Sequence, residues 1–115
     1  MIVRIAGTLT LLLGFAIWAD LLPVLVPIHM LLGLLLVIGL ASAALAGRRA
    51  GIGNGLAGTA IAWAIVTLVF GLNQQTILPG EGHVVVEVAH LVVGLVAIAL
   101  GEVIGARAAR GGAAA

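Results

Sequence analysis

Two long segments without formal charge constrain this chain more than any other feature. Residues 21–47 and 50–80 contain no Asp, Glu, Lys or Arg. The whole chain of 115 residues is 63% hydrophobic and only 8% charged, whereas a soluble domain carries about 25% charged residues. A chain this apolar cannot cover a globule with polar surface, so we expect lipid to be its solvent.

Apolar segments near the ~20 residues needed to cross a bilayer occur four times. Backbone polar groups must be satisfied internally in lipid, which favours helices. We therefore expect an all-α membrane protein with one domain, residues 1–115. Its predicted transmembrane helices cover about residues 5–22, 24–46, 56–72 and 84–106. The first segment could instead be a signal peptide, but its apolar run is long and lacks a small-residue cleavage site before Pro23.

All basic residues lie at one set of predicted helix ends. They are Arg4, Arg48, Arg49, Arg107 and Arg110. By the positive-inside rule, both termini and the middle loop are expected in the cytoplasm, and the other two loops outside. We expect a multi-pass protein of the bacterial inner membrane. The absence of cysteine excludes disulfides, thiolate redox chemistry and iron–sulfur clusters held by this chain.

Two pairs of similar segments suggest an internal repeat. "IAGT" at residues 5–8 is echoed by "LAGT" at 56–59, and "HMLLGLLLVIG" from His29 by "HLVVGLVAIALG" from His90. The simplest interpretation is two tandem helical hairpins in one orientation, although chance similarity remains open in so apolar a chain. The second and fourth helices would then run parallel. At 1.5 Å per residue, both histidines would lie roughly 5–10 Å below the outer boundary.

These two histidines are the candidate functional residues. Ionisable side chains inside a bilayer are costly and usually functional. Haem iron takes two axial ligands on opposite faces of the ring, and neutral imidazole is a common one. Gly33 and Gly94 lie one turn below His29 and His90, and Gly14 is expected at a similar depth, where it could admit a porphyrin edge. The alternative is that these glycines serve ordinary helix packing.

A four-helix membrane bundle with histidines on its second and fourth helices resembles the cytochrome b family. That resemblance implies haem b clasped between these helices, with His29 and His90 as iron ligands. The two-haem pattern of the family needs a second histidine about thirteen or fourteen residues further along each helix. This chain has Ser42 or Ala43, and Val103 or Ile104, at those places, so one haem is implied. No outer Arg or Lys can pair with the propionates, which leaves backbone N–H groups, water or the side chains of Asn73, Gln74, Gln75, Thr76 and His83.

Other polar residues allow alternative sites. Glu87 and His90 form a Glu-x-x-His pair, so a mononuclear zinc or iron site with His29 is conceivable. Glu87 could instead orient a ligand histidine by a hydrogen bond, or remain an interfacial carboxylate. Glu102 is expected near the inner boundary, within reach of Arg48, Arg49 or Arg107. Trp63 lies in the middle of the third helix, where it could pack against a porphyrin or the core.

The leading hypothesis is a mono-haem b electron-transfer protein with bis-histidine ligation near the outer face. If it is an enzyme, it is a haem-dependent membrane oxidoreductase; no catalytic side chain is singled out. Expected partners are lipid and a quinol or small outer-side reductant, in a homo-oligomer or larger complex, and no nucleic acid. One alternative is an accessory subunit of a membrane complex. Another is a small four-helix transporter, although residues 9–19 lack the glutamate of small multidrug resistance transporters.

Overall fold

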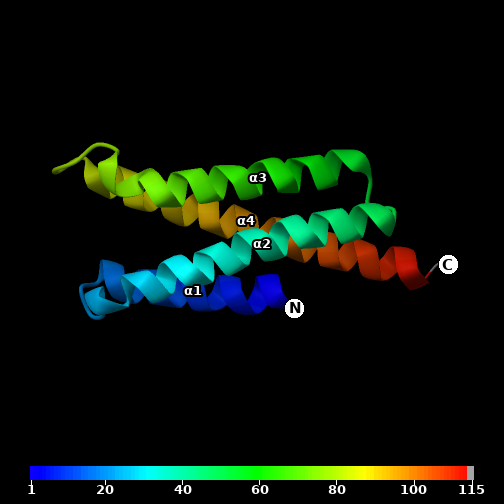
Figure 1. Cartoon of the computed structure of the whole chain (residues 1–115), viewed down its shortest axis with the longest axis horizontal. Helices are drawn as coiled ribbons and strands as arrows, with labels where there is room; N and C mark the ends of the chain where they lie inside the picture. The colour runs from blue at the N-terminus through cyan, green and yellow to red at the C-terminus, as the bar shows by residue number, and fades with distance from the viewer. Residues whose placement is uncertain (114–115) are drawn as a thin grey trace.

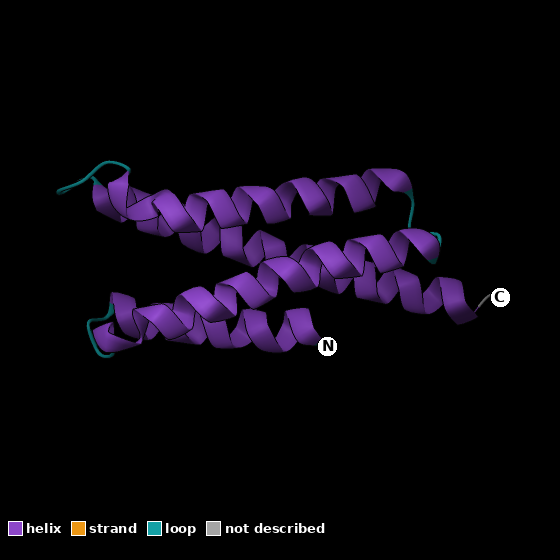
Figure 2. Cartoon of the chain, in the orientation of Figure 1, coloured by secondary structure: helices purple, strands orange, loops and turns teal. Residues whose placement is uncertain are grey.

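The computed structural model describes residues 1–113 and contains four helices joined by short turns (Figure 2). The helices are α1 (Ile2–Trp18), α2 (Val26–Arg49), α3 (Asn54–Asn73) and α4 (His83–Ala113), with 3₁₀ turns at Pro23–Leu25 and Gln74–Thr76. The expected all-α architecture is confirmed for the described residues. The bundle is elongated, 53 × 23 × 16 Å, and its helices alternate in direction, so α2 and α4 run parallel (Figure 1).

Local sequence explains where the helices end. α1 stops at Trp18, four residues before the predicted end, because the chain turns at Asp20, whose φ is 57°. Pro23 then begins a 3₁₀ turn, so α2 starts at Val26, two residues after its predicted start. The middle linker has Gly51 and Gly53 at φ values of 82° and 94°, a conformation that glycine adopts without steric cost.

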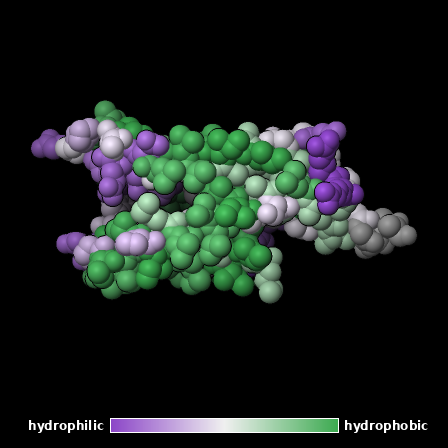
Figure 3. Space-filling model, in the orientation of Figure 1, coloured by the Kyte–Doolittle hydropathy of each residue, from purple (hydrophilic) through white to green (hydrophobic). Residues whose placement is uncertain are grey.

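Three helices are long and apolar enough to cross a membrane: α2 with its preceding turn, α3 with its following turn, and α4. α1 is apolar but has only 17 residues, or about 25 Å at 1.5 Å per residue. Hydrophobic side chains cover the middle of the bundle, and hydrophilic ones gather at its two ends (Figure 3). This distribution suits a membrane protein, while the fourth span and the side of the termini stay predictions.

Small side chains dominate the core. Its fully or nearly fully buried residues include Leu36, Leu40, Ala44, Ala57, Ala60, Ala64, Ala97 and Ile104. Small residues let helix backbones approach closely, which is how helices associate in lipid. At the N-terminal end of α1, Val3 occupies the space beside Gly39 of α2 and Gly101 of α4, and a Cβ on Gly101 would overlap its side chain.

The same contact sets the partner of Glu102. Because the start of α1 packs beside Gly101, Arg4 comes next to Glu102, and its guanidinium donates to both carboxylate oxygens. The expectation that Glu102 pairs with one of the later arginines was therefore wrong. The N-terminal end of α1 lies part of the way along the bundle (Figure 1), well before α2 and α4 end.

Candidate haem site

His29 and His90 face each other between the two hairpins. His29 is in the first turn of α2 and His90 is eight residues into α4. Their ring centroids are 6.1 Å apart and their planes are inclined by 57°. The structure therefore brings together, at one depth, the two histidines that the sequence singles out.

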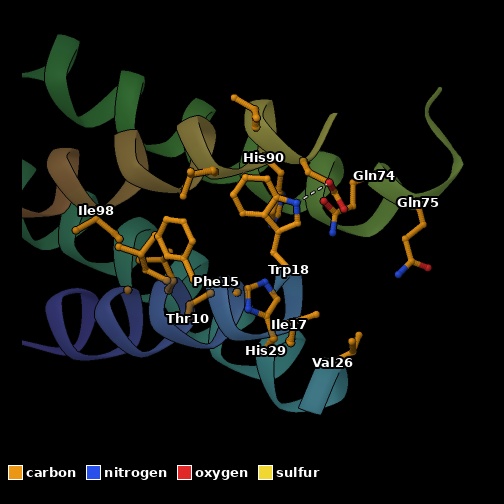
Figure 4. Close-up of a pocket in the computed structure, with 18 of the residues that line it drawn as sticks. Thr10, Phe15, Ile17, Trp18, Val26, His29, Gln74, Gln75, His90 and Ile98 are labelled. Atoms are coloured by element: carbon orange, nitrogen blue, oxygen red, sulfur yellow. Dashed lines mark hydrogen bonds between the residues drawn. The ribbon is translucent and has the colours of Figure 1, made fainter. Parts of the chain in front are cut away.

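Both imidazoles line a cavity of about 220 Å³ between α1, α2 and α4. Most of its wall is apolar and includes Leu11, Phe15, Leu36, Leu91 and Ile98, and its polar lining includes Thr10, Gln74, Gln75, His83 and Glu87. Figure 4 shows this arrangement around the two histidines. The Nδ1 atoms of His29 and His90 are buried and have no hydrogen-bond partner. A buried polar atom without a partner is costly, so each Nδ1 is a candidate for a further hydrogen bond or a ligand.

Each imidazole packs against a glycine of the helix that precedes its own in the chain. A Cβ on Gly14 of α1 would lie 3.0 Å from Cε1 of His29 and 3.5 Å from its Nδ1. A Cβ on Gly71 of α3 would lie 3.4 Å from Cε1 of His90. Gly71 was missed by the sequence reasoning, although its place near the C-terminal end of α3 is a usable signal. Each hairpin therefore packs its histidine against a glycine of its own first helix.

Gly33 and Gly94, one turn below the histidines, do not pack against an imidazole as Gly14 and Gly71 do. A Cβ on Gly33 or Gly94 would meet no atom within 4 Å. Gly94 lines the cavity, so its missing side chain enlarges the space beside His90. Gly33 is half-buried and lies outside the cavity lining. The structure thus brings Gly14 and Gly94 to the site and leaves Gly33 beside it.

A hydrogen bond between α1 and α4 joins two residues that line the cavity. The Nε1–H of Trp18 on α1 donates to a carboxylate oxygen of Glu87 on α4 over 2.8 Å (Figure 4). The hydrogen bond of the Glu87 side chain therefore goes to Trp18, and none to a histidine is found among the described residues. Among the described residues no group of three His, Cys, Asp or Glu side chains is placed to hold a metal ion, so the three-ligand site with His29 and Glu87 is not formed.

Side chains of α3 close the other side of the histidine pair. The Phe70 ring centroid lies 6.0 Å from that of His90. Trp63 donates its indole N–H to the carbonyl of Val93 over 3.0 Å, and the Thr67 hydroxyl donates to the carbonyl of Trp63. These contacts tie α3 to α4 and keep Trp63 in the core. Free space is therefore found on the α1 side of the histidines.

The spacing of the two imidazoles suits a single iron ion between them, whereas the cavity is small for a porphyrin. A ring nitrogen bound to a metal ion lies about 2 Å from it, so two imidazoles on opposite sides of one ion have centroids roughly 6 Å apart. The observed separation is 6.1 Å. The cavity is smaller than the roughly 300–1,000 Å³ of typical ligand pockets. The cavity would therefore have to widen to admit a porphyrin; two side chains of its wall, Phe15 and Trp18, are 45% and 51% exposed.

Comparison with known proteins adds no family assignment. No family model, no curated protein and no solved structure matches this chain. The cytochrome b resemblance accordingly stays a prediction from helix order, the two histidines and the small residues near them.

Proposed function

We propose that this protein is a membrane-embedded haem b protein that transfers electrons near its outer face. His29 and His90 are the proposed axial ligands. The observation that carries the proposal is a pair of imidazoles on parallel helices, 6.1 Å apart, lining one cavity with both Nδ1 atoms unpartnered. Bound haem would supply one-electron redox chemistry, and two protein ligands favour electron transfer over oxygen binding.

The chain itself positions and shields this site. Gly14 and Gly71 leave room for the two imidazoles, because a side chain at either position would press on a histidine ring. Leu11, Phe15 and Leu91 line the cavity with apolar atoms, which exclude water and lower the local dielectric constant. A low dielectric strengthens the influence of every nearby charge on the redox potential.

The outer end of the cavity suits the propionate groups. Gln74, Gln75 and His83 line it, and the outer loops contain no Arg or Lys. Amide N–H groups are therefore the proposed donors to the propionates. We propose a membrane quinol or a small outer-side reductant as electron donor, since this end of the site lies nearest the outer surface in the proposed orientation.

Haem content and spectrum test the proposal. Wild-type protein expressed with ample haem should contain about one haem b per chain in a pyridine haemochrome assay, because one histidine pair serves one iron. His29→Ala and His90→Ala should each abolish the low-spin bis-histidine spectrum. Gly55→Ala is the matched control, since a Cβ there meets no atom within 4 Å.

Two results would contradict the proposal. One is wild-type protein that is folded yet contains no haem. The other is a normal bis-histidine spectrum in both alanine variants, which would mean that other residues hold the iron.

A further inference from the structure

Four arginines gather at the end of the bundle opposite the histidines. Arg48 and Arg49 end α2, and Arg107 and Arg110 lie in the last turns of α4. The two helix ends touch there, because a Cβ on Gly111 would lie 2.8 Å from the carbonyl oxygen of Ala50. All four arginine side chains are exposed.

No carboxylate balances this charge within the described residues. The single ion pair found there joins Arg4 to Glu102. The remaining acidic residues, Asp20, Glu81 and Glu87, belong to the opposite end of the bundle. The four arginines therefore form a basic end with an uncompensated formal charge of +4.

A groove at this basic end combines charge with an apolar side chain. It is shallow and open, and it is lined by Leu45, Arg48 and Arg49, all on α2. Residues three and four apart share a helix face, so Leu45 lies one turn above the two guanidinium groups. Guanidinium groups bind phosphate with paired, charge-assisted hydrogen bonds.

An exposed apolar stripe leads into the groove. Leu31, Ile38 and Leu45 are spaced by seven residues along α2 and are 57%, 53% and 52% exposed. Seven residues are close to two helical turns, so the three side chains follow one face. The stripe is about 21 Å long at 1.5 Å per residue. A molecule bound in the groove could therefore place a phosphate at Arg48 and Arg49 and an apolar chain along the stripe.

We propose that this groove binds the headgroup of an anionic phospholipid, with one acyl chain along the Leu31–Ile38–Leu45 stripe. Charge complementarity selects an anionic headgroup, and the stripe selects a lipid over free phosphate. Clusters of four or more basic residues next to membrane helices are typical of such recognition. The proposal is independent of haem, since the groove and the histidine pair occupy opposite ends of α2.

The experiment titrates the full-length protein in uncharged detergent with phosphatidylglycerol, phosphatidylcholine or inorganic phosphate, and counts bound molecules by native mass spectrometry. Wild-type protein should bind phosphatidylglycerol saturably and bind the other two weakly. Arg48→Gln with Arg49→Gln should weaken phosphatidylglycerol binding about 30-fold, from the contribution of each arginine near a charged surface.

A variant of equal net charge provides the control. Arg107→Gln with Arg110→Gln removes the same two charges outside the groove, and should weaken binding only about two- to threefold through screened attraction. Leu45→Gln keeps all charges and should also weaken lipid binding. Circular dichroism of the helices shows whether each variant is folded. If the Arg48→Gln, Arg49→Gln variant is unfolded, lipid binding by Leu45→Gln tests the proposal instead.

Three outcomes would overturn the proposal. Equal losses in the two arginine pairs would indicate diffuse attraction without a groove site. Inorganic phosphate binding as tightly as phosphatidylglycerol would indicate an anion site that does not need lipid. Unchanged lipid binding in folded Leu45→Gln would exclude a role for the apolar stripe.

Discussion

Replacing Gly14 by alanine places one methyl group against the proposed ligand His29. The new Cβ would lie 3.0 Å from Cε1 of the imidazole, whereas carbon atoms pack best at about 3.5–4.0 Å. The ring must therefore move by a few tenths of an ångström. Overpacking of this kind typically costs about 1–3 kcal/mol, which corresponds to a loss of haem affinity of about 5- to 150-fold.

Two other glycines make this prediction quantitative. A Cβ on Gly71 would lie 3.4 Å from Cε1 of His90, close to ordinary van der Waals contact, so the ring need hardly move and the loss should stay below about fivefold. A Cβ on Gly33 meets nothing within 4 Å, so Gly33→Ala should keep the affinity of the wild-type protein. The expected order of haem loss is Gly14→Ala, then Gly71→Ala, then Gly33→Ala.

The assay titrates haem-free protein in detergent with haemin and follows the Soret band. Thermal unfolding of the haem-free variants shows whether the fold itself has changed. Unchanged affinity in Gly14→Ala together with a loss in Gly33→Ala would refute the reasoning, because the effect would then not follow the distance from each Cβ to the imidazoles.

Two further predictions concern the ends of the helices. A reporter that needs export should be active when inserted near Gly80. A reporter that is active only in the cytoplasm should be active when fused after Ala115, a position outside the described residues. The reverse pattern would contradict the orientation inferred from the arginines. Trp18→Phe keeps the ring but removes the N–H that donates to Glu87. This change should lower the free energy of unfolding by about 0.5–1 kcal/mol, the lower part of the range for one hydrogen bond, because the pair is exposed. An unchanged thermal midpoint would show that this bond contributes nothing to stability.

The sequence by itself determined the helices and the pairing of the histidines. The charge-free segments and their apolar content require helices in lipid, and Pro23, Gly51 and Gly53 mark the turns. Because α2 and α4 are parallel, counting residues from each helix start was enough to expect His29 and His90 at one depth. These inferences depend on composition and on position along the chain, both of which the sequence states directly.

Only the tertiary structure decided which side chains touch across helices. Gly71 against His90, Trp18 donating to Glu87, and Arg4 paired with Glu102 all join residues of different helices. Such contacts depend on how far each helix is rotated about its axis and shifted along it. Helices that are apolar on every face carry little periodic pattern to indicate that rotation. In this protein the rotation is set by small-residue packing, such as Val3 against Gly39 and Gly101, which becomes apparent only when the helices are assembled.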